Sequence, residues 1–138
     1  MRVFLDANIL VTVLNKEYPL FPYAGKLLSL ANRPDVELFT SPTCIAISFY
    51  FSSKKHGESH SKKKIARLLG HIRLTTVDEK CTHQAIENPN VLDLEDGIQY
   101  YSAKNASCNF IITENPGDFH FSEVRIYSCR DFLINEVQ

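Results

Sequence analysis

The stretch that decides the fold is Val3-Phe4-Leu5-Asp6-Ala7-Asn8-Ile9-Leu10, in which a short apolar run is followed by a carboxylate and then by a helix-like pattern. An apolar run of this length predicts a buried strand, and residues 8–14 predict a helix. Asp6 would then lie at the carboxyl end of the strand. Open α/β sheets place their ligand sites at that edge.

The rest of the chain alternates strand-like and helix-like segments, which is typical of a parallel sheet covered on both faces. We therefore expect one domain over residues 1–138, with a three-layer α/β/α fold and a central, mostly parallel sheet of about five strands. Residues 52–61 are polar and charged, and they predict a mobile loop. The expected strands are residues 2–5, 36–40, 73–76, 109–113 and 124–127, and the expected helices are residues 7–15, 22–31, 42–52, 61–71, 79–87, 94–106 and 131–137.

Composition is consistent with an ordinary globular domain, because 138 residues with 44% apolar side chains suffice for one core. The net charge of −1 argues neither for nor against a polyanionic partner, but the charges are unevenly spread. Residues 52–67 are strongly basic and residues 78–96 are strongly acidic. A basic flank beside an acidic pocket suits a polyanion held near bound cations.

The four cysteines are scattered and form neither a zinc motif nor a redox motif. Free core thiols in a reducing compartment are the better interpretation. The N-terminal residues lack the pattern of a signal peptide, and no apolar run approaches the ~20 residues of a membrane span. We expect a cytoplasmic protein without a membrane segment.

Two further acidic segments flank element boundaries, namely Asp93-Leu94-Glu95-Asp96 and Thr113-Glu114-Asn115-Pro116-Gly117-Asp118. Several converging carboxylates are most simply explained by a hard divalent cation. Asp96 lies in a helix that the pattern predicts to be largely buried, where an unpaired carboxylate is costly, so metal binding is preferred there. Thr113, Asn115 and Asp118 belong to a turn that can still direct Asp118 at a metal.

Structural roles compete with this interpretation at several positions. Asp6 could cap the following helix as readily as bind a metal, and Asp93 could cap the helix that holds Asp96 while also supporting the site. Asn8 could be a helix cap or turn residue rather than a residue that orients Asp6. The pair His56 and His60 lacks a third ligand and is assigned to the solvated loop.

The lysines around that loop have two interpretations. They could form a solvated face, or they could contact the phosphates of a nucleic acid. The residues concerned are Lys54, Lys55, Lys62, Lys63 and Lys64.

Four segments together resemble the signature segments of PIN-domain proteins, and in particular the branch of VapC-like toxins from toxin–antitoxin pairs. They are VFLDANIL, SPTCIAISFYF, LDLEDGIQYYSAKNA and FIITENPGDF, and the resemblance covers nearly the whole chain. It implies an endoribonuclease that depends on Mg²⁺ or Mn²⁺, with an RNA substrate, a cognate antitoxin and a homodimer as expected partners. It also implies that Asp6, Asp96 and Asp118 hold the metal, supported by Asn8, Asp93, Thr113 and Asn115.

The chain departs from the family pattern at two positions. Ile47 occupies the position where many relatives carry a helical glutamate, and Asn115 stands where relatives often have aspartate. Asp93, one helical turn before Asp96, could compensate. A second hypothesis is therefore a catalytically weakened PIN module that binds RNA or a protein partner without cleaving.

Two other enzyme classes also begin with an aspartate at a strand end. A phosphatase of the haloacid dehalogenase type needs a second aspartate two residues later, where this chain has Asn8. A receiver domain needs adjacent N-terminal acids and a phosphorylatable aspartate after a later strand, whereas Thr40-Ser41-Pro42 offers none. Neither pattern fits.

Overall fold

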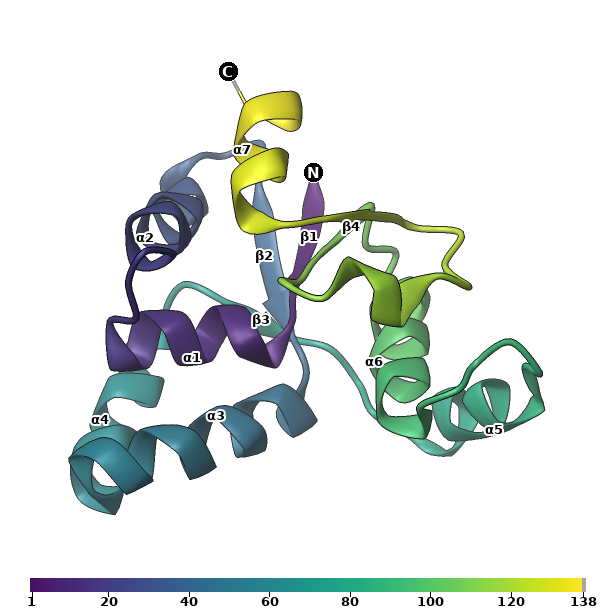
Figure 1. Ribbon diagram of the computed structural model, residues 1–138, viewed down its shortest axis with the longest axis horizontal. Coiled ribbons are helices and arrows are strands. Elements are labelled where there is room, and N and C mark those ends of the chain that lie inside the picture. The colour runs from purple at the N-terminus through teal and green to yellow at the C-terminus, as the bar shows by residue number, and fades with distance from the viewer. Residues whose placement is uncertain (138) are drawn as a thin grey trace.

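The sheet is parallel throughout and has helices on both faces (Figure 1). The structure is a computed structural model that describes residues 1–137, and within them the sheet has five strands in the order β3-β2-β1-β4-β5. This confirms the expected α/β/α fold. The strands are β1 (Arg2–Leu5), β2 (Glu37–Thr40), β3 (Arg73–Leu74), β4 (Phe110–Ile112) and β5 (Arg125–Tyr127).

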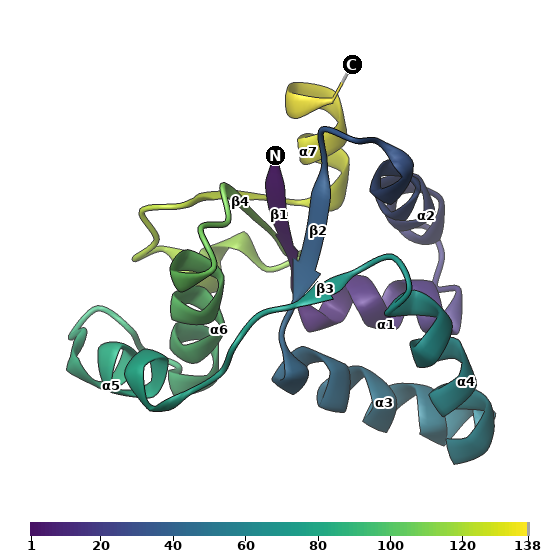
Figure 2. The same ribbon diagram turned by 180° about the vertical axis from the view of Figure 1, so that it is seen from behind.

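The helices divide between the two faces according to the direction of the chain. Four lie on one side, on the path from β1 to β3, and two lie on the other, on the return to β4 (Figures 1 and 2). The first four are α1 (Ala7–Asn15), α2 (Phe21–Ser29), α3 (Pro42–His56) and α4 (Glu58–Leu68), and the return pair is α5 (Glu79–Glu87) and α6 (Leu94–Asn105). The last helix, α7 (Cys129–Glu136), contacts α2 and β5.

The strand order creates a switch point between β1 and β4. The chain leaves β1 toward β2 on one side, and it later returns to place β4 on the other side of β1. Ligands of open α/β sheets bind outside the carboxyl ends of the strands at such a point. Leu5 is paired with Ile112, so the next residues, Asp6 and Thr113, lie side by side at this edge.

The core is formed by these central strands. Val3, Phe4 and Leu5 of β1 and Ile111 and Ile112 of β4 are all fully buried. Strands covered on both faces read as continuous apolar runs, which is why the sequence pattern located them. The expected free thiols are confirmed, because all four cysteines are buried and unpaired.

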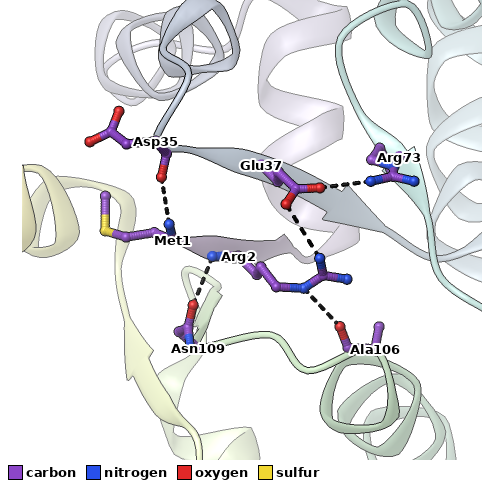
Figure 3. Close-up of polar contacts among 7 residues, drawn as sticks. All are labelled: Met1, Arg2, Asp35, Glu37, Arg73, Ala106 and Asn109. Carbon is purple, nitrogen blue, oxygen red and sulfur yellow. Dashed lines mark hydrogen bonds and ion pairs between the residues drawn. The ribbon is translucent and has the colours of Figure 1, made fainter.

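The amino edge of the sheet is closed by a polar network around Arg2 (Figure 3). Its guanidinium donates to the Ala106 carbonyl at 3.0 Å and to Glu37 at 3.3 Å, and Arg73 pairs with the other oxygen of Glu37 at 2.7 Å. These two arginines lower the pKa of the Glu37 carboxyl, with the Arg73 hydrogen bond as the largest cause. Opposite charges are therefore matched at this end of the sheet.

The expected loop over residues 52–61 is wrong. Helix α3 continues to His56 and α4 begins at Glu58, so the single residue Gly57, with a φ of +83°, separates the two helices. The hydroxyls of Ser52 and Ser61 are buried and lie 2.8 Å apart, which joins the two helices. The polar residues of this segment thus form a helical hairpin, whose only position requiring glycine is the turn itself.

The lysines of this hairpin explain part of its polarity. Lys55 donates to the Asn15 carbonyl at 3.2 Å and Lys64 donates to the Leu14 carbonyl at 2.9 Å. Both carbonyls lie at the C-terminal end of α1, where cations are stabilising. His56 is also part of α3 and half-buried, with its ring against His60, so its assignment to a solvated loop is wrong.

Boundaries elsewhere differ by a few residues. β3 is limited to two residues and ends before the expected residue 76. Helix α7 starts two residues earlier than expected, because the Ser128 side chain accepts a hydrogen bond from the Asp131 amide and caps it. No helix of residues 1–137 is long and apolar enough to span a membrane.

Gly97 provides a test of the packing that positions α6. A Cβ at this position would lie 2.5 Å from Val91 Cγ1 and 3.0 Å from Ala85 Cβ, whereas a Cβ at Gly25 would have no neighbour within 4 Å. We expect Gly97→Ala to lower the free energy of unfolding by about 1–3 kcal/mol through overpacking, although alanine is the better helix former. Gly25→Ala should be neutral or stabilising. Chemical denaturation of both variants checks this, and equal stability of the two would contradict the assigned packing.

Candidate active site at the carboxyl edge of the sheet

A pocket of about 600 Å³ opens at the switch point between β1 and β4. Its lining is dominated by carboxylates from separate segments of the chain, and no basic side chain among the described residues contributes to it. Like charges in one pocket repel each other unless a cation or protons are present. The lining carboxylates are those of Asp6, Glu17, Asp93, Glu95, Asp96, Glu114 and Asp118.

Asp6 is held in place by both of its side-chain oxygens. One accepts a hydrogen bond from the Ala7 amide at 2.8 Å and caps α1, and the other accepts from the Thr113 hydroxyl at 2.8 Å. The capping role is therefore confirmed. Each carboxylate oxygen has a second lone pair, so capping leaves Asp6 able to bind a cation. Burial raises the pKa of Asp6, and these hydrogen bonds oppose the rise.

Asn8 connects this network to the loop after β4. Its side-chain amide donates to the Thr113 hydroxyl at 3.1 Å and accepts from the Glu114 amide at 3.3 Å. The cap or turn role considered for Asn8 is wrong, because Asp6 caps the helix and Asn8 lies within it. Asn8 instead orients Thr113, and Thr113 orients Asp6.

Asp93 and Asp96 lie at the start of α6. Asp93 accepts a hydrogen bond from the Asp96 amide at 3.2 Å, which confirms it as the N-cap. The pKa of Asp96 is raised to about 7, first by burial and then by the nearby charges of Asp93, Asp118, Asp6 and Glu95. Such a shift is typical of groups at functional sites.

Asp118 lies in the expected turn after β4. The turn is a short 3-10 helix over Pro116–Phe119, and the Asp118 amide donates to the Asn115 carbonyl at 3.1 Å. Both Asn115 and Asp118 line the pocket. The structure thus brings Asp6, Asn8, Asp93, Asp96, Asn115 and Asp118 around one pocket, with the buried Thr113 bonded to Asp6.

Ile47 lies on α3 and lines the same pocket as Asp6. The lysines of the basic segment do not line the pocket. Lys54 and Lys55 lie near the end of α3, and Lys62, Lys63 and Lys64 lie on α4.

Sequence reasoning did not single out several residues near the acids. Glu95 is adjacent to Asp96, and burial together with Asp93 and Asp6 raises its pKa. Glu17 follows Lys16, whose left-handed backbone ends α1, so helical spacing gives no information on its side chain. Cys44 Sγ lies 3.9 Å from an oxygen of Asp6, and burial raises the pKa of this thiol to about 12.

The donor set suits a hard cation. All the charged groups of the pocket offer oxygen ligands, as Mg²⁺ and Mn²⁺ prefer. Within residues 1–137 no three His, Cys, Asp or Glu side chains form a ready-made metal cage. Mg²⁺ does not need one, because it usually keeps several waters and binds through one or two carboxylates. The residues present therefore fit such an ion.

Comparison with known proteins identifies the family. A family model described as PIN domain matches residues 2–117. The chain belongs to the PIN domain family. It is also 25% identical over 134 residues to ribonuclease VapC1 of Aquifex aeolicus (strain VF5), covering 95% of this chain and 92% of that protein. The expected resemblance to VapC-like PIN domains is thereby confirmed.

Solved structures share the fold at low sequence identity. VapBC-1 from nontypeable Haemophilus influenzae has a TM-score of 0.73 at 17% identity, and covers 94% of this PIN domain and 99% of that chain. VapBC2 from Rickettsia felis, bound to a DNA fragment from its promoter, has a TM-score of 0.71 at 19% identity over 93% and 98% of the two chains. VapC20 of Mycobacterium tuberculosis, described as a sarcin-ricin loop cleaving toxin, has a TM-score of 0.66 at 16% identity over 89% and 98%.

Asp96 predicts how the stability of the metal-free PIN domain depends on pH. The pKa of Asp96 is about 7 in the folded protein and 3.8 for an unperturbed aspartate, as in the unfolded chain. Between these two pH values the folded state therefore binds more protons than the unfolded state. The free energy of unfolding should therefore fall as the pH rises from about 4 to about 7. Asp96→Asn should reduce this slope and stabilise the protein at pH 8.

The measurement is denaturation in EDTA at a series of pH values. Glu87→Gln is the matched control, because it removes one exposed carboxylate of α5 that does not line the acidic pocket. If Asp96→Asn and Glu87→Gln changed the pH slope equally, Asp96 would not titrate near neutrality.

Thr113 tests the hydrogen bonds that fix Asp6. Thr113→Val keeps the shape but removes the hydroxyl, which leaves the Asp6 carboxylate and the Asn8 amide without this partner. We expect a loss of about 1–3 kcal/mol in the free energy of unfolding, because unsatisfied polar groups near the core are costly. Thr113→Ser keeps the hydroxyl and should retain most of the free energy of unfolding. A valine variant as stable as the serine variant in urea titration would show that the network contributes nothing.

Proposed function

We propose that the protein is a divalent-metal-dependent endoribonuclease that acts as the toxin of a toxin–antitoxin pair. One observation carries the proposal: Asp6, Asp96 and Asp118 come from three distant segments and line one pocket at the switch point of the sheet. Burial, and after it the nearby charges of Asp93, Asp118, Asp6 and Glu95, raise the pKa of Asp96 to about 7, and shifts of this kind cluster at functional sites. These three residues are the proposed catalytic metal ligands.

The relatives support RNA as the substrate and a protein as the partner. Ribonuclease VapC1 is named for RNA cleavage, and VapC20 is described as a toxin that cleaves the sarcin-ricin loop. VapBC-1 and VapBC2 are described as VapBC structures. By analogy we propose a cognate antitoxin, and from the family resemblance we propose a homodimer as the assembly.

The chain's own residues would prepare the reaction. Thr113 and Asn8 hold Asp6 at a fixed orientation, so this ligand loses little entropy when the site is loaded. Asp96 must release its proton before it can bind a cation, so activity should rise through neutral pH. A bound Mg²⁺ or Mn²⁺ would neutralise phosphate charge and activate water. Asp93 and Asn115 line the same pocket, and we propose them as supporting residues.

The lysines contribute in different ways. Lys55 and Lys64 already donate to carbonyls at the end of α1, so part of their role is structural. Lys62 and Lys63 are exposed on α4, and Lys54 is exposed on α3. We propose all five as contacts for RNA phosphates, with the structural pair contributing least.

A second candidate function follows from Ile47. This apolar side chain lines the pocket at a position where a carboxylate added to the three proposed metal ligands would strengthen cation binding. A PIN module that binds RNA or a protein partner without cleaving is therefore the alternative.

Cleavage assays decide between the two functions. With Mg²⁺ or Mn²⁺ the parent should cut structured or single-stranded RNA, and EDTA should stop it. Asp6→Asn, Asp96→Asn and Asp118→Asn should each lose more than roughly 100-fold in rate, because even outer residues of metal sites typically contribute 10–100-fold. Glu87→Gln should cleave like the parent.

Three outcomes are informative. Asparagine variants that cleave like the parent would place the active site elsewhere or reveal a contaminating nuclease. If the parent were inactive and the Ile47→Glu variant cleaved RNA, the parent would be the PIN module that binds without cleaving. An inactive Ile47→Glu protein with an inactive parent would reject the ribonuclease altogether.

A further inference from the structure

The acidic pocket has a second, apolar half. Val11, Leu20, Ile47 and Phe51 line it together with the carboxylates. Ile47 and Phe51 are four residues apart on α3, so they lie on one face of that helix. Where many relatives are expected to carry a helical glutamate, the chain presents the apolar side chain of Ile47 beside the metal-ligand candidates.

Phe51 is a large apolar residue that remains exposed. It is 47% accessible and lines the pocket of about 600 Å³. Its neighbour Tyr50 packs edge-on against it, with ring centroids 5.3 Å apart, and the Lys54 ammonium lies 4.2 Å from the centroid of the Tyr50 ring. Tyr50 itself does not line the pocket. Phe51 is thus the aromatic residue that the pocket offers to a ligand.

Cations continue the same helix beyond Phe51. Lys54 and Lys55 follow it by three and four residues, which places them one turn further from the acids. Along α3 the order is therefore the apolar side chain Ile47, the aromatic ring of Phe51, and two cations.

We propose that Phe51, supported by Ile47, is a base subsite on which an unpaired nucleobase of the substrate stacks. The inference rests on the proposed function and specifies its substrate as RNA with an unstacked base next to the scissile phosphate. Bases in a duplex cannot offer a face to an aromatic side chain, whereas loops and single strands can. The pocket volume is within the range of roughly 300–1,000 Å³ that is typical of small-molecule sites.

Tryptophan fluorescence reports directly on the stacking. The chain contains no tryptophan, so Phe51→Trp would introduce a single reporter in the subsite. In an Asp118→Asn background, which suppresses cleavage, a single-stranded oligoribonucleotide should quench this fluorescence. Tyr23→Trp is the control, because Tyr23 lies on α2, is 39% exposed and does not line the pocket, and it should be quenched much less.

Affinity provides the second measurement. Phe51→Ala should weaken binding of the oligoribonucleotide by about 5- to 100-fold, in line with the stacking contribution of one base. Phe51→Tyr should bind like the parent, and so should Tyr23→Ala, which removes an exposed aromatic ring that does not line the pocket. An abasic nucleotide at the stacked position should cost the parent the same factor and cost Phe51→Ala nothing further, because the two changes remove one contact.

The results that would reject the base subsite differ from those that would reject the ribonuclease proposal. Phe51→Ala with parental affinity, or an abasic penalty that Phe51→Ala leaves unchanged, would reject the base subsite even if cleavage is normal. Normal RNA binding by Phe51→Ala combined with loss of a co-expressed protein partner would also reject it, in favour of protein docking. Quenching at Phe51→Trp by RNA that the parent does not cleave would keep the subsite and reject the nuclease.

Discussion

The site depends on one hydrogen-bonded chain, in which Asn8 donates to the Thr113 hydroxyl and that hydroxyl donates to Asp6. It joins the first residues beyond β1 and β4, the two strands on either side of the switch point. Thr113 is fully buried, so its hydroxyl cannot hydrogen-bond to solvent instead. Asp6 is therefore fixed by the sheet rather than by a mobile loop, and the acids on α6 and on the turn after β4 are positioned relative to it.

The two edges of the sheet have opposite electrostatic environments for their carboxylates. At the carboxyl edge, carboxylates are gathered without basic neighbours and Asp96 holds its proton up to neutral pH. At the amino edge, Glu37 is flanked by Arg2 and Arg73 and its pKa is lowered. The first arrangement opposes folding above neutral pH and the second favours it. Gathered like charges of this kind are tolerated when a ligand later neutralises them.

The sequence was sufficient for the strands and for most helices, because buried parallel strands such as Val3-Phe4-Leu5 carry a continuous apolar signal. It also pointed to Asp6, Asp96 and Asp118 as residues of one site, because their segments flank element boundaries and resemble the PIN-domain signatures, and all three line the pocket. It failed at the α3–α4 hairpin, where buried serines and capping lysines serve tertiary contacts that look like loop composition. Glu17 and Phe51 were missed for a related reason. Glu17 reaches the pocket because the backbone turns after Lys16, and Phe51 reaches it because α3 packs against α1. Neither cause can be recognised from the local sequence.

The closed network at the amino edge has a consequence for how this protein can change. Arg2, Glu37 and Arg73 are partly exposed, lie at the end of the strands opposite to the pocket, and share no residue with its lining (Figure 3). Substitutions there would alter the stability of the sheet without touching the carboxylates that line the pocket. The ion pairs that stabilise the sheet and the acidic pocket thus lie at opposite ends of the same strands, so one can be changed while the other is kept.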